Sequence, residues 1–285
     1  MGCVEAIDAL GHRVRLARPA RRVVSLVPSE TLSVCTIAGV ERLVGRTRYC
    51  VEPADALGSV PVVGGTKDVD VDAVLALEPD LVLANQEENT RRVVEALRAR
   101  GIAVHVSFPC SVAASNAYLE SLGRLLGADV TAYRASVEPT PIRARAFVPI
   151  WRDPWMTFDG RTFADDVLRA AGIANAFADR ARRYPLSADL GHAPAVDPGE
   201  RDTRYPRITL DEVVARAPDL VLLPDEPYAF GPSDVAELRA LDVPAARAGR
   251  VLTVCGADLF WYGVRTRAGI ERLRALLDVL PAPDR

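Results

Sequence analysis

The sequence predicts an α/β protein of two Rossmann-like lobes joined by a linking helix, and three observations support this. One segment occurs twice, because residues 71–88 read VDAVLALEPDLVLANQEE and residues 210–227 read LDEVVARAPDLVLLPDEP. In each copy a helical pattern precedes a short apolar run, which is typical of a strand buried on both faces of a parallel sheet. With 285 residues, 49% of them hydrophobic, the chain can fill two ordinary cores.

The repeated segment also indicates where a site would lie. Pro79 and Pro218 are expected to end the two helices, because proline cannot continue the helical hydrogen-bond ladder. Polar residues, including Glu87 and Glu226, follow the two strands at once. Ligands of open α/β sheets bind outside the carboxyl ends of the strands, so we expect these two loops to contribute to a binding site.

The remaining elements follow from apolar periodicity and from the positions of proline and glycine. In the N-terminal half we expect a hairpin at residues 4–16, strands at 23–27, 43–47 and 102–106, and helices at 29–38, 88–100 and 111–126, the last extending over 129–137. In the C-terminal half we expect strands at 146–150 and 250–254, helices at 162–171, 233–241 and 268–280, and loops at 180–207 and 255–263. The lobes would span residues 1–110 and 144–285, with the linking helix region at 111–143.

Composition excludes several classes of protein. The net charge of −3 is spread without long blocks of one sign, so no nucleic-acid surface is expected. No apolar run approaches the ~20 residues of a membrane span. Residues 1–20 lack the apolar core of a secretion signal, so a cytoplasmic location is expected, or a periplasmic or lipid-anchored one if a signal ending at Gly2-Cys3 was trimmed. Five cysteines at irregular spacing predict reduced thiols.

An ordered set of motifs resembles one known family. The segments RRVVSLVPSET, VGRTRYC, VGGTKDVDVDAVLALEPDLVLA, FVPIWRDPW and DLFWYG are similar to those of the helical-backbone (class III) metal-chelate binding proteins. That family includes the vitamin B12 and ferric-siderophore receptors of ABC importers. The resemblance covers nearly the whole chain and implies two α/β lobes, a rigid linking helix and an inter-lobe cleft that holds a large metal chelate. Relative to the family, residues 186–204 look inserted.

The resemblance also implies a protein partner. Family members carry one acidic residue on each lobe that docks against arginines of the membrane permease, and Asp72 and Asp211 stand where those acids belong. The family usually has glutamate there. Acids in the first turn of a helix also complement the helix dipole, so a purely structural role is the alternative.

Aromatic residues are scarce, and many of them follow predicted strands: Trp151, Trp155, Trp261, Tyr49, Tyr228 and Tyr262. Large flat ligands such as corrinoids, haems or catechol siderophores need aromatic walls and a few fixed polar groups. Arg48, Lys67 and Arg152 are suited to the carboxylate or phosphate groups of such a ligand. Ser29 is expected as an N-cap whose helix would favour an anion. The alternative is that the aromatic residues only cap the ends of the sheets.

Metal binding by the chain's own side chains is not expected. Cys50, Cys110 and Cys255 each follow a strand, and convergence would make a soft thiolate site for zinc, copper(I) or a corrinoid cobalt. Buried, inert cysteine is the commoner outcome. The histidines are too dispersed for a zinc motif, and His105 is expected to be a core residue.

These observations favour a binding protein over an enzyme. No nucleophile elbow, HExxH motif or paired acid motif stands out. The hypothesis is a non-enzymatic binder of a corrinoid, haem or ferric siderophore, acting with an ABC importer or as a cytoplasmic carrier of the same fold. The alternative is a cytoplasmic enzyme that modifies such a ligand, with Glu226 or Cys50 as the reactive group.

Overall fold

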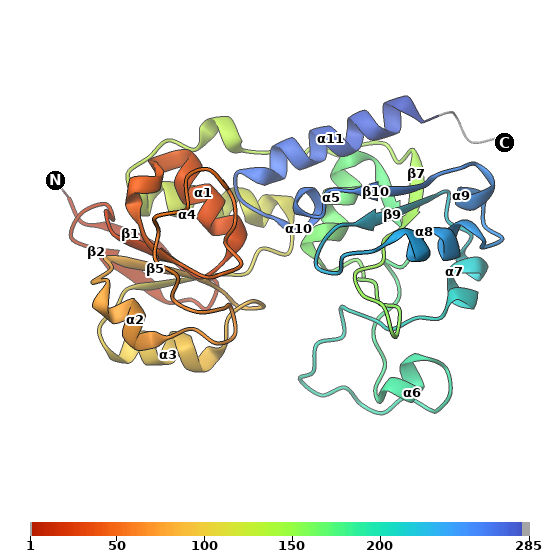
Figure 1. Ribbon diagram of the computed structural model, residues 1–285, viewed down its shortest axis with the longest axis horizontal. Helices are drawn as coiled ribbons and strands as arrows, with labels where there is room; N and C mark the ends of the chain where they lie inside the picture. Colours follow the sequence, from red (N-terminus) through yellow and green to blue (C-terminus); the bar gives the residue numbers. More distant parts are fainter. Residues whose placement is uncertain (1, 281–285) are drawn as a thin grey trace. The chain divides into compact units, whose positions relative to one another are not determined.

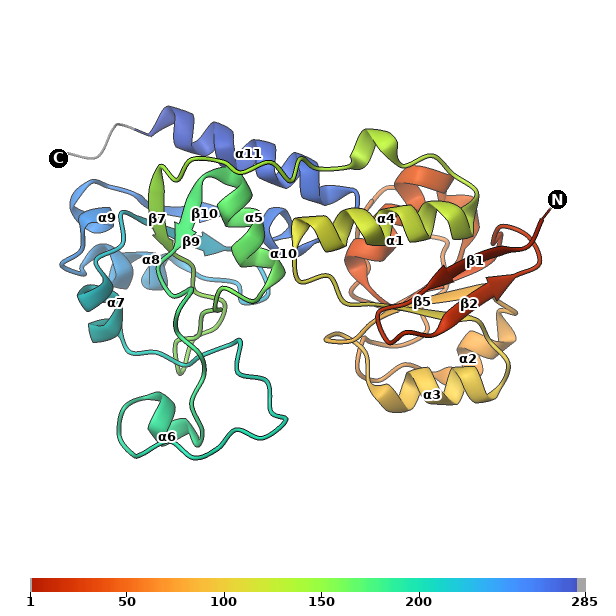
Figure 2. The same ribbon diagram turned by 180° about the vertical axis from the view of Figure 1, so that it is seen from behind.

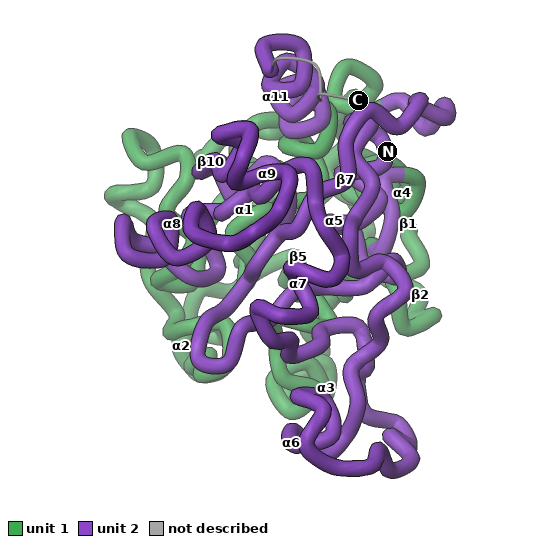
Figure 3. Tube along the Cα trace, turned by 90° about the vertical axis from the view of Figure 1, so that its right-hand side faces the viewer, with its two compact units in different colours: residues 1–109, 113–135, 261–267 green, residues 110–112, 136–260, 268–285 purple. Residues whose placement is uncertain are grey.

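The computed structural model describes residues 2–280 and separates into two compact units. Unit 1 contains the chain up to residue 109, residues 113–135 and residues 261–267 (Figure 3). Unit 2 contains residues 110–112, 136–260 and the chain from residue 268 onward. A short segment far along the sequence therefore completes the fold of unit 1.

Unit 1 is a parallel sheet with an antiparallel hairpin. The hairpin pairs β1 (Val4–Ile7) with β2 (Arg13–Leu16), which confirms the prediction. The sheet contains β3 (Val23–Ser25), β4 (Leu43–Arg46), β5 (Leu81–Asn85) and β6 (Val104–Ser107) in the order β4-β3-β5-β6. The helices are α1 (Pro28–Ala38), α2 (Val71–Ala76), α3 (Arg91–Ala99) and α4 (Val112–Leu126), with 3-10 turns at Val40–Arg42 and Thr131–Tyr133.

Both faces of this sheet are covered by helices. The ribbons show α2 and α3 on one face and α1 and α4 on the other (Figures 1 and 2). Val74 of α2 and Leu97 of α3 are fully buried against Val82 of β5 and Val104 of β6. The predicted strands therefore read as continuous apolar runs because each has two buried faces.

Unit 2 repeats this architecture. Its sheet contains β7 (Ala144–Phe147), β8 (Ile173–Asn175), β9 (Leu220–Pro224) and β10 (Val251–Val254) in the order β10-β9-β7-β8, all parallel. Its helices are α5 (Phe163–Ala171), α6 (Leu186–Asp189), α7 (Leu210–Arg216), α8 (Pro232–Arg239), α9 (Pro244–Arg247) and α10 (Ala257–Phe260). The last helix, α11 (Arg265–Val279), begins within residues assigned to unit 1. None of the helices within residues 2–280 has the length and apolar character that a membrane crossing requires.

The duplication predicted from the sequence extends to individual hydrogen bonds. In unit 1 the Asp80 amide donates to the Arg22 carbonyl at 2.8 Å, and the Arg22 guanidinium donates to the carbonyl that ends α2, that of Leu77, at 2.6 Å. In unit 2 the Asp219 amide donates to the Arg145 carbonyl at 2.8 Å, and the Arg145 guanidinium donates to the carbonyl of Arg216. Each unit thus fixes the end of a helix with an arginine from the neighbouring strand.

The two repeated helices end in the same unusual backbone conformation. Glu78 and Ala217, which directly precede Pro79 and Pro218, have φ values of 45° and 44°. A residue before proline avoids the right-handed helical region, and here both copies adopt left-handed φ instead of an extended one. The predicted helix ends are therefore confirmed, within the few residues by which such boundaries vary.

Two predicted elements are wrong. No α-helix extends over residues 129–137, because Gly127 has φ of 68° and the Ala128 amide turns back to the Gly123 carbonyl at 2.9 Å. The predicted loop at residues 255–263 contains the short helix α10. The segment at residues 180–207 is irregular as expected, except for the single turn of α6.

The helix caps of the repeat provide a test of the fold. Asp70 and Thr209 are the N-caps of α2 and α7, and they accept from the amides of Ala73 at 3.0 Å and Glu212 at 3.2 Å. We expect Asp70→Ala and Thr209→Ala each to lower the free energy of unfolding by about 1 kcal/mol in urea titrations. The control is Asp72→Asn, an exposed first-turn change that costs roughly 0.5 kcal/mol. Equal losses in all three variants would contradict the capping role.

Candidate functional site

A row of aromatic rings lies at the carboxyl edge of the unit 2 sheet. Trp151 and Trp155 come from the loop after β7, and Tyr228 and Phe230 come from the loop after β9. The ring centroids of Trp151 and Tyr228 are 5.3 Å apart, those of Tyr228 and Phe230 are 4.8 Å apart, and Phe230 stacks on Trp155 at 5.8 Å. Because β7 and β9 are neighbouring parallel strands, their exit loops meet at one edge of the sheet.

The row runs from the surface into the core. Trp151 is 46% exposed, Tyr228 and Phe230 are partly buried, and Trp155 belongs to the hydrophobic core of unit 2 at 8% exposure. Trp155 was predicted as a ligand contact, and burial corrects this to a packing role. Phe230 was not predicted, although its spacing from Tyr228 in a polar loop could have indicated it.

Arg152 supports the aromatic row instead of presenting a free charge. Its guanidinium lies 5.1 Å from the centroid of the Trp155 ring. It forms ion pairs with Asp234 and, at 2.7 Å, with Glu237. Two carboxylates therefore already balance the cation that the sequence assigned to a ligand.

The predicted residues of unit 1 lie on exposed loops. Arg48 pairs with Asp68 at 2.9 Å, and its guanidinium lies 5.8 Å from the centroid of the 54% exposed Tyr49 ring. The Lys67 ammonium donates to the Glu87 carbonyl at 2.5 Å, so these two residues join the loops that follow β4 and β5. Within unit 1, the geometry brings Arg48 to Tyr49 and Lys67 to Glu87.

Ser29 is not the N-cap of α1. The helix begins at Pro28, and its N-cap is Val27 without a side-chain hydrogen bond. Proline is favoured at the first helical position, because its missing N–H would have no helical acceptor there. Ser29 is buried within the first turn, and its carbonyl accepts from the Ser33 hydroxyl at 2.8 Å.

Tyr262 belongs to a buried polar network in unit 1. Its hydroxyl donates to Glu30 Oε1 at 2.8 Å and lies 2.7 Å from the Ser107 hydroxyl, which also reaches Glu30 Oε1 at 2.6 Å. The Asn85 amide donates to both hydroxyls, at 3.1 and 3.2 Å. Tyr262, which was predicted as a ligand contact, is only 6% exposed in this network, and Glu30 is fully buried. The neighbouring Trp261 is partly buried.

Burial dominates the proton affinity of Glu30. It raises the pKa of this carboxyl to about 8, although the hydrogen bonds from Ser107 and Tyr262 act in the opposite direction. The negative charge of Glu88 raises the pKa of Glu30 further. The Glu30 carboxyl therefore holds its proton at neutral pH.

Other predicted residues occupy a range of environments. Asp72 and Asp211 are exposed in the first turns of α2 and α7, so permease docking stays a prediction. Glu226 is partly buried in the loop after β9. His105 is a core residue as predicted, and burial lowers its pKa to about 4.

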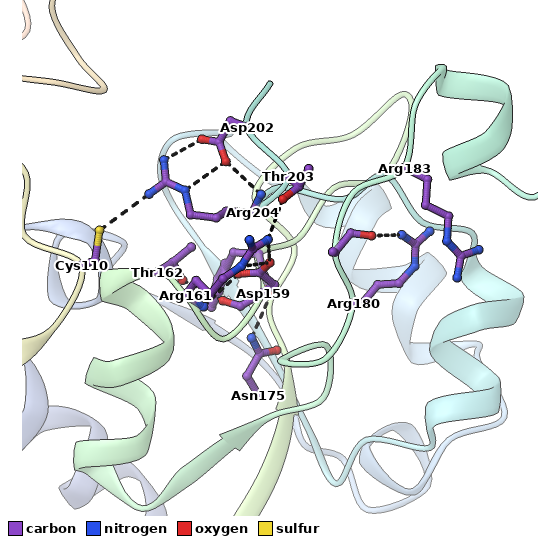
Figure 4. Close-up of polar contacts among 12 residues, drawn as sticks. Cys110, Asp159, Arg161, Thr162, Asn175, Arg180, Arg183, Asp202, Thr203 and Arg204 are labelled. Carbon is purple, nitrogen blue, oxygen red and sulfur yellow. Dashed lines mark hydrogen bonds and ion pairs between the residues drawn. The ribbon is translucent and has the colours of Figure 1, made fainter. Parts of the chain in front are cut away.

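The cysteines differ in exposure. Cys50 is buried in unit 1, where burial raises its pKa and its Sγ lies 3.1 Å from the Thr47 hydroxyl. Cys110 is partly exposed and lies 3.8 Å from the Arg204 guanidinium, both in unit 2 (Figure 4). Cys255 is exposed. Across residues 2–280, no group of three or more histidine, cysteine or acidic side chains is placed to hold a metal ion.

The sequence is similar to those of known binding proteins. Residues 23–129 match the model of the periplasmic binding protein family. The chain is 26% identical over 220 residues to the vitamin B12-binding protein of Yersinia pestis (strain Pestoides F), covering 73% of this chain and 70% of that protein.

Solved structures share the fold. The vitamin B12-binding protein BtuF of Vibrio cholerae superposes with a TM-score of 0.67 at 21% identity and covers 92% of this chain and 98% of its own. A periplasmic heme-binding protein from Pseudomonas aeruginosa gives a TM-score of 0.67 at 23% identity and covers 93% and 94%. The duplicated parallel sheets and these structures lead to one conclusion. The chain has the two-lobed α/β fold of these binding proteins, and its residues 23–129 match the periplasmic binding protein family.

Proposed function

We propose that the chain binds a metal chelate of the corrinoid, haem or ferric siderophore class, as the substrate-binding component of an ABC importer. The observation that carries the proposal is the aromatic row at the carboxyl edge of the unit 2 sheet, with Trp151 at its exposed end. The names of the relatives support the ligand class, because they describe proteins that bind vitamin B12 or heme.

The row suits a large flat ligand for a physical reason. The indole of Trp151 is held edge-on by Tyr228, which itself contacts Phe230, so the exposed ring is fixed before a ligand arrives. A rigid aromatic face contributes contact area and loses little conformational entropy on binding. The proposed contacts in unit 2 are therefore Trp151 and Tyr228, with Glu226 as a polar neighbour.

Unit 1 contributes to the same proposal through its exposed loops. Arg48, Tyr49, Lys67 and Glu87 remain proposed ligand contacts, on the basis of exposure at the ends of β4 and β5. Asp72 and Asp211 remain the proposed docking acids for the permease.

Titration of the purified chain with haemin, cyanocobalamin and a ferric siderophore, followed by absorbance, tests the proposal. We expect saturable binding of one of them, and we expect Trp151→Ala to weaken that binding by roughly tenfold or more, as for an aromatic hot spot. Tyr133→Ala, a partly buried aromatic change in the 3-10 turn of unit 1, is the control and should leave the affinity unchanged. Failure of all three ligands to bind would refute the proposal, and a ligand recovered in chemically altered form would favour an enzyme.

A further inference from the structure

A tyrosine in the irregular segment of unit 2 is contacted by two arginines. The guanidinium carbons of Arg182 and Arg201 lie 4.3 and 4.2 Å from the centroid of the Tyr184 ring. The Tyr184 hydroxyl donates to the Asp202 carbonyl at 2.7 Å, and the Tyr184 backbone pairs with Val196. These contacts hold the ring and bring two cations from opposite ends of the segment to one place.

Three arginines nearby are neutralised by a carboxylate. Figure 4 shows Arg161 contacting Asp159 and Arg204 contacting Asp202, the latter at 2.6 Å. Arg180 pairs with Asp189 at 2.9 Å in the interior. Carboxylates therefore neutralise some arginines in this part of unit 2 and leave others unpaired.

Arg182, Arg201 and Arg207 are among the unpaired arginines. None of the three has an ion pair with a carboxylate among residues 2–280. Arg201 donates only to the backbone carbonyls of Asp197 and Pro198, and Arg207 donates to that of Tyr205. Arg182 makes no side-chain hydrogen bond with a described residue, and its Nε is buried without an acceptor. Donors left in this state cost free energy that an acceptor would recover.

Two of the unpaired cations also repel each other. Arg207 is partly buried, and its pKa is lowered first by burial and then by the positive charge of Arg182, although the Asp189 carboxylate acts in the opposite direction. Two neighbouring guanidinium groups repel each other electrostatically, and an anion that binds to both offsets this repulsion. Arginine is suited to this role because its planar donors match carboxylate and phosphate oxygens.

This cluster is connected to the aromatic row within unit 2. Met156 pairs with Trp151 on one side and with Arg207 on the other, and the Ile208 amide donates to the Trp155 carbonyl at 2.9 Å. The backbone that carries Arg207 is therefore hydrogen-bonded to the loop that carries Trp151 and Trp155.

We propose that Arg182, Arg201 and Arg207, arranged around Tyr184, form a binding site for an oxyanion group, a carboxylate or a phosphate. The group can belong to a free anion or to the acidic periphery of a chelate, and both sources offer the same oxygens to the guanidinium donors. Of these residues, Arg201 lies within residues 186–204, which the sequence marks as inserted relative to the family, and the others flank that segment. The existence of the site does not depend on the chelate proposal.

Calorimetric titration with inorganic phosphate at low salt tests the free anion, and haemin compared with its dimethyl ester tests the acidic groups of a chelate. The variants are Arg182→Gln and Arg201→Gln. The matched control is Arg183→Gln, which removes the same charge from an exposed neighbour that has no side-chain contact with a described residue. Thermal melting of each variant, followed by circular dichroism, confirms that the fold is kept.

If the anion is free, phosphate binds saturably, and each test variant weakens it by roughly tenfold while the control changes it less than about twofold. If the anion belongs to the chelate, haemin binds more tightly than its ester, and Arg182→Gln removes that difference. The proposal is overturned when phosphate does not bind and haemin and its ester bind alike or not at all, or when Arg183→Gln weakens binding as much as Arg182→Gln. Phosphate binding without haemin binding would remove haem from the proposed ligands and leave the oxyanion site in place.

Discussion

Asp189→Ala is expected to lower the free energy of unfolding by roughly 3–5 kcal/mol, because it leaves a buried guanidinium with only the Glu212 carboxylate, at 3.0 Å, and removes the acceptor of three donors. Arg180 is 5% exposed at its side chain, and that of Asp189 is fully buried. The carboxylate accepts from Arg180 Nη1 at 2.9 Å and from the amides of Arg183 and Arg207 at 2.9 and 2.7 Å. The substitution therefore removes the group that ties both ends of the irregular segment together.

Urea titration followed by tryptophan fluorescence measures this loss, since Trp151 and Trp155 both lie in unit 2. Asp242→Ala is the matched control, because it removes an exposed ion pair with Arg247. Exposed pairs contribute roughly 0–1 kcal/mol. Asp189→Asn, which keeps the shape and one acceptor oxygen, should lose less than Asp189→Ala. A loss for Asp189→Ala no larger than that of the control would show that the segment is held by other contacts.

Much of the fold could be predicted because local and global signals agree. The repeated run Pro-Asp-Leu-Val-Leu marks equivalent strands β5 and β9, and both occupy equivalent places in sheets of the same order. Gly39 ends α1 as predicted, because glycine adopts its φ of 88° without strain. The helix predicted over residues 129–137 does not form for a related reason. The left-handed φ of Gly127 ends α4, although the apolar periodicity of the sequence continues beyond it.

The candidate site was less predictable, because a position after a strand does not determine whether a side chain is exposed. Trp151 and Trp155 follow the same strand four residues apart, yet only Trp151 is open to solvent. Arg152 was identified from its charge, but its partner Asp234 lies on a helix far along the sequence. Whether an arginine is free to bind a ligand depends on contacts with residues far along the sequence, and residue type and spacing do not predict these contacts.

The buried carboxyl of Glu30 leads to the second large prediction, a loss of stability as pH rises. Its folded pKa of about 8 lies above the ordinary value of 4.5, so the folded state binds the proton more tightly than the unfolded state. Stability from this group is complete below pH 4.5 and is lost as the pH rises through about 8. At about 1.36 kcal/mol for each tenfold change in proton affinity, the loss is roughly 4–5 kcal/mol.

Comparison with Glu30→Gln isolates this effect from other titrating groups. The titratable groups that face Glu30 are Tyr262 and Tyr118, whose pKa values burial raises well above 10, and Glu88, whose pKa burial also raises. Ser107 also faces Glu30 and does not titrate. Glutamine keeps the volume and stays neutral, so the variant should match the native chain near pH 5 and exceed its stability by several kcal/mol near pH 9.

Urea titrations between pH 5 and 9 supply the measurement, with Glu95→Gln, an exposed glutamate of α3, as the control. The difference between the native chain and the control should stay nearly constant over this range. A similarly constant difference for Glu30→Gln would mean that the carboxyl reaches solvent when it ionises. A rising difference would show that the fold of unit 1 keeps the Glu30 carboxyl buried and neutral, and that ionising it destabilises this unit.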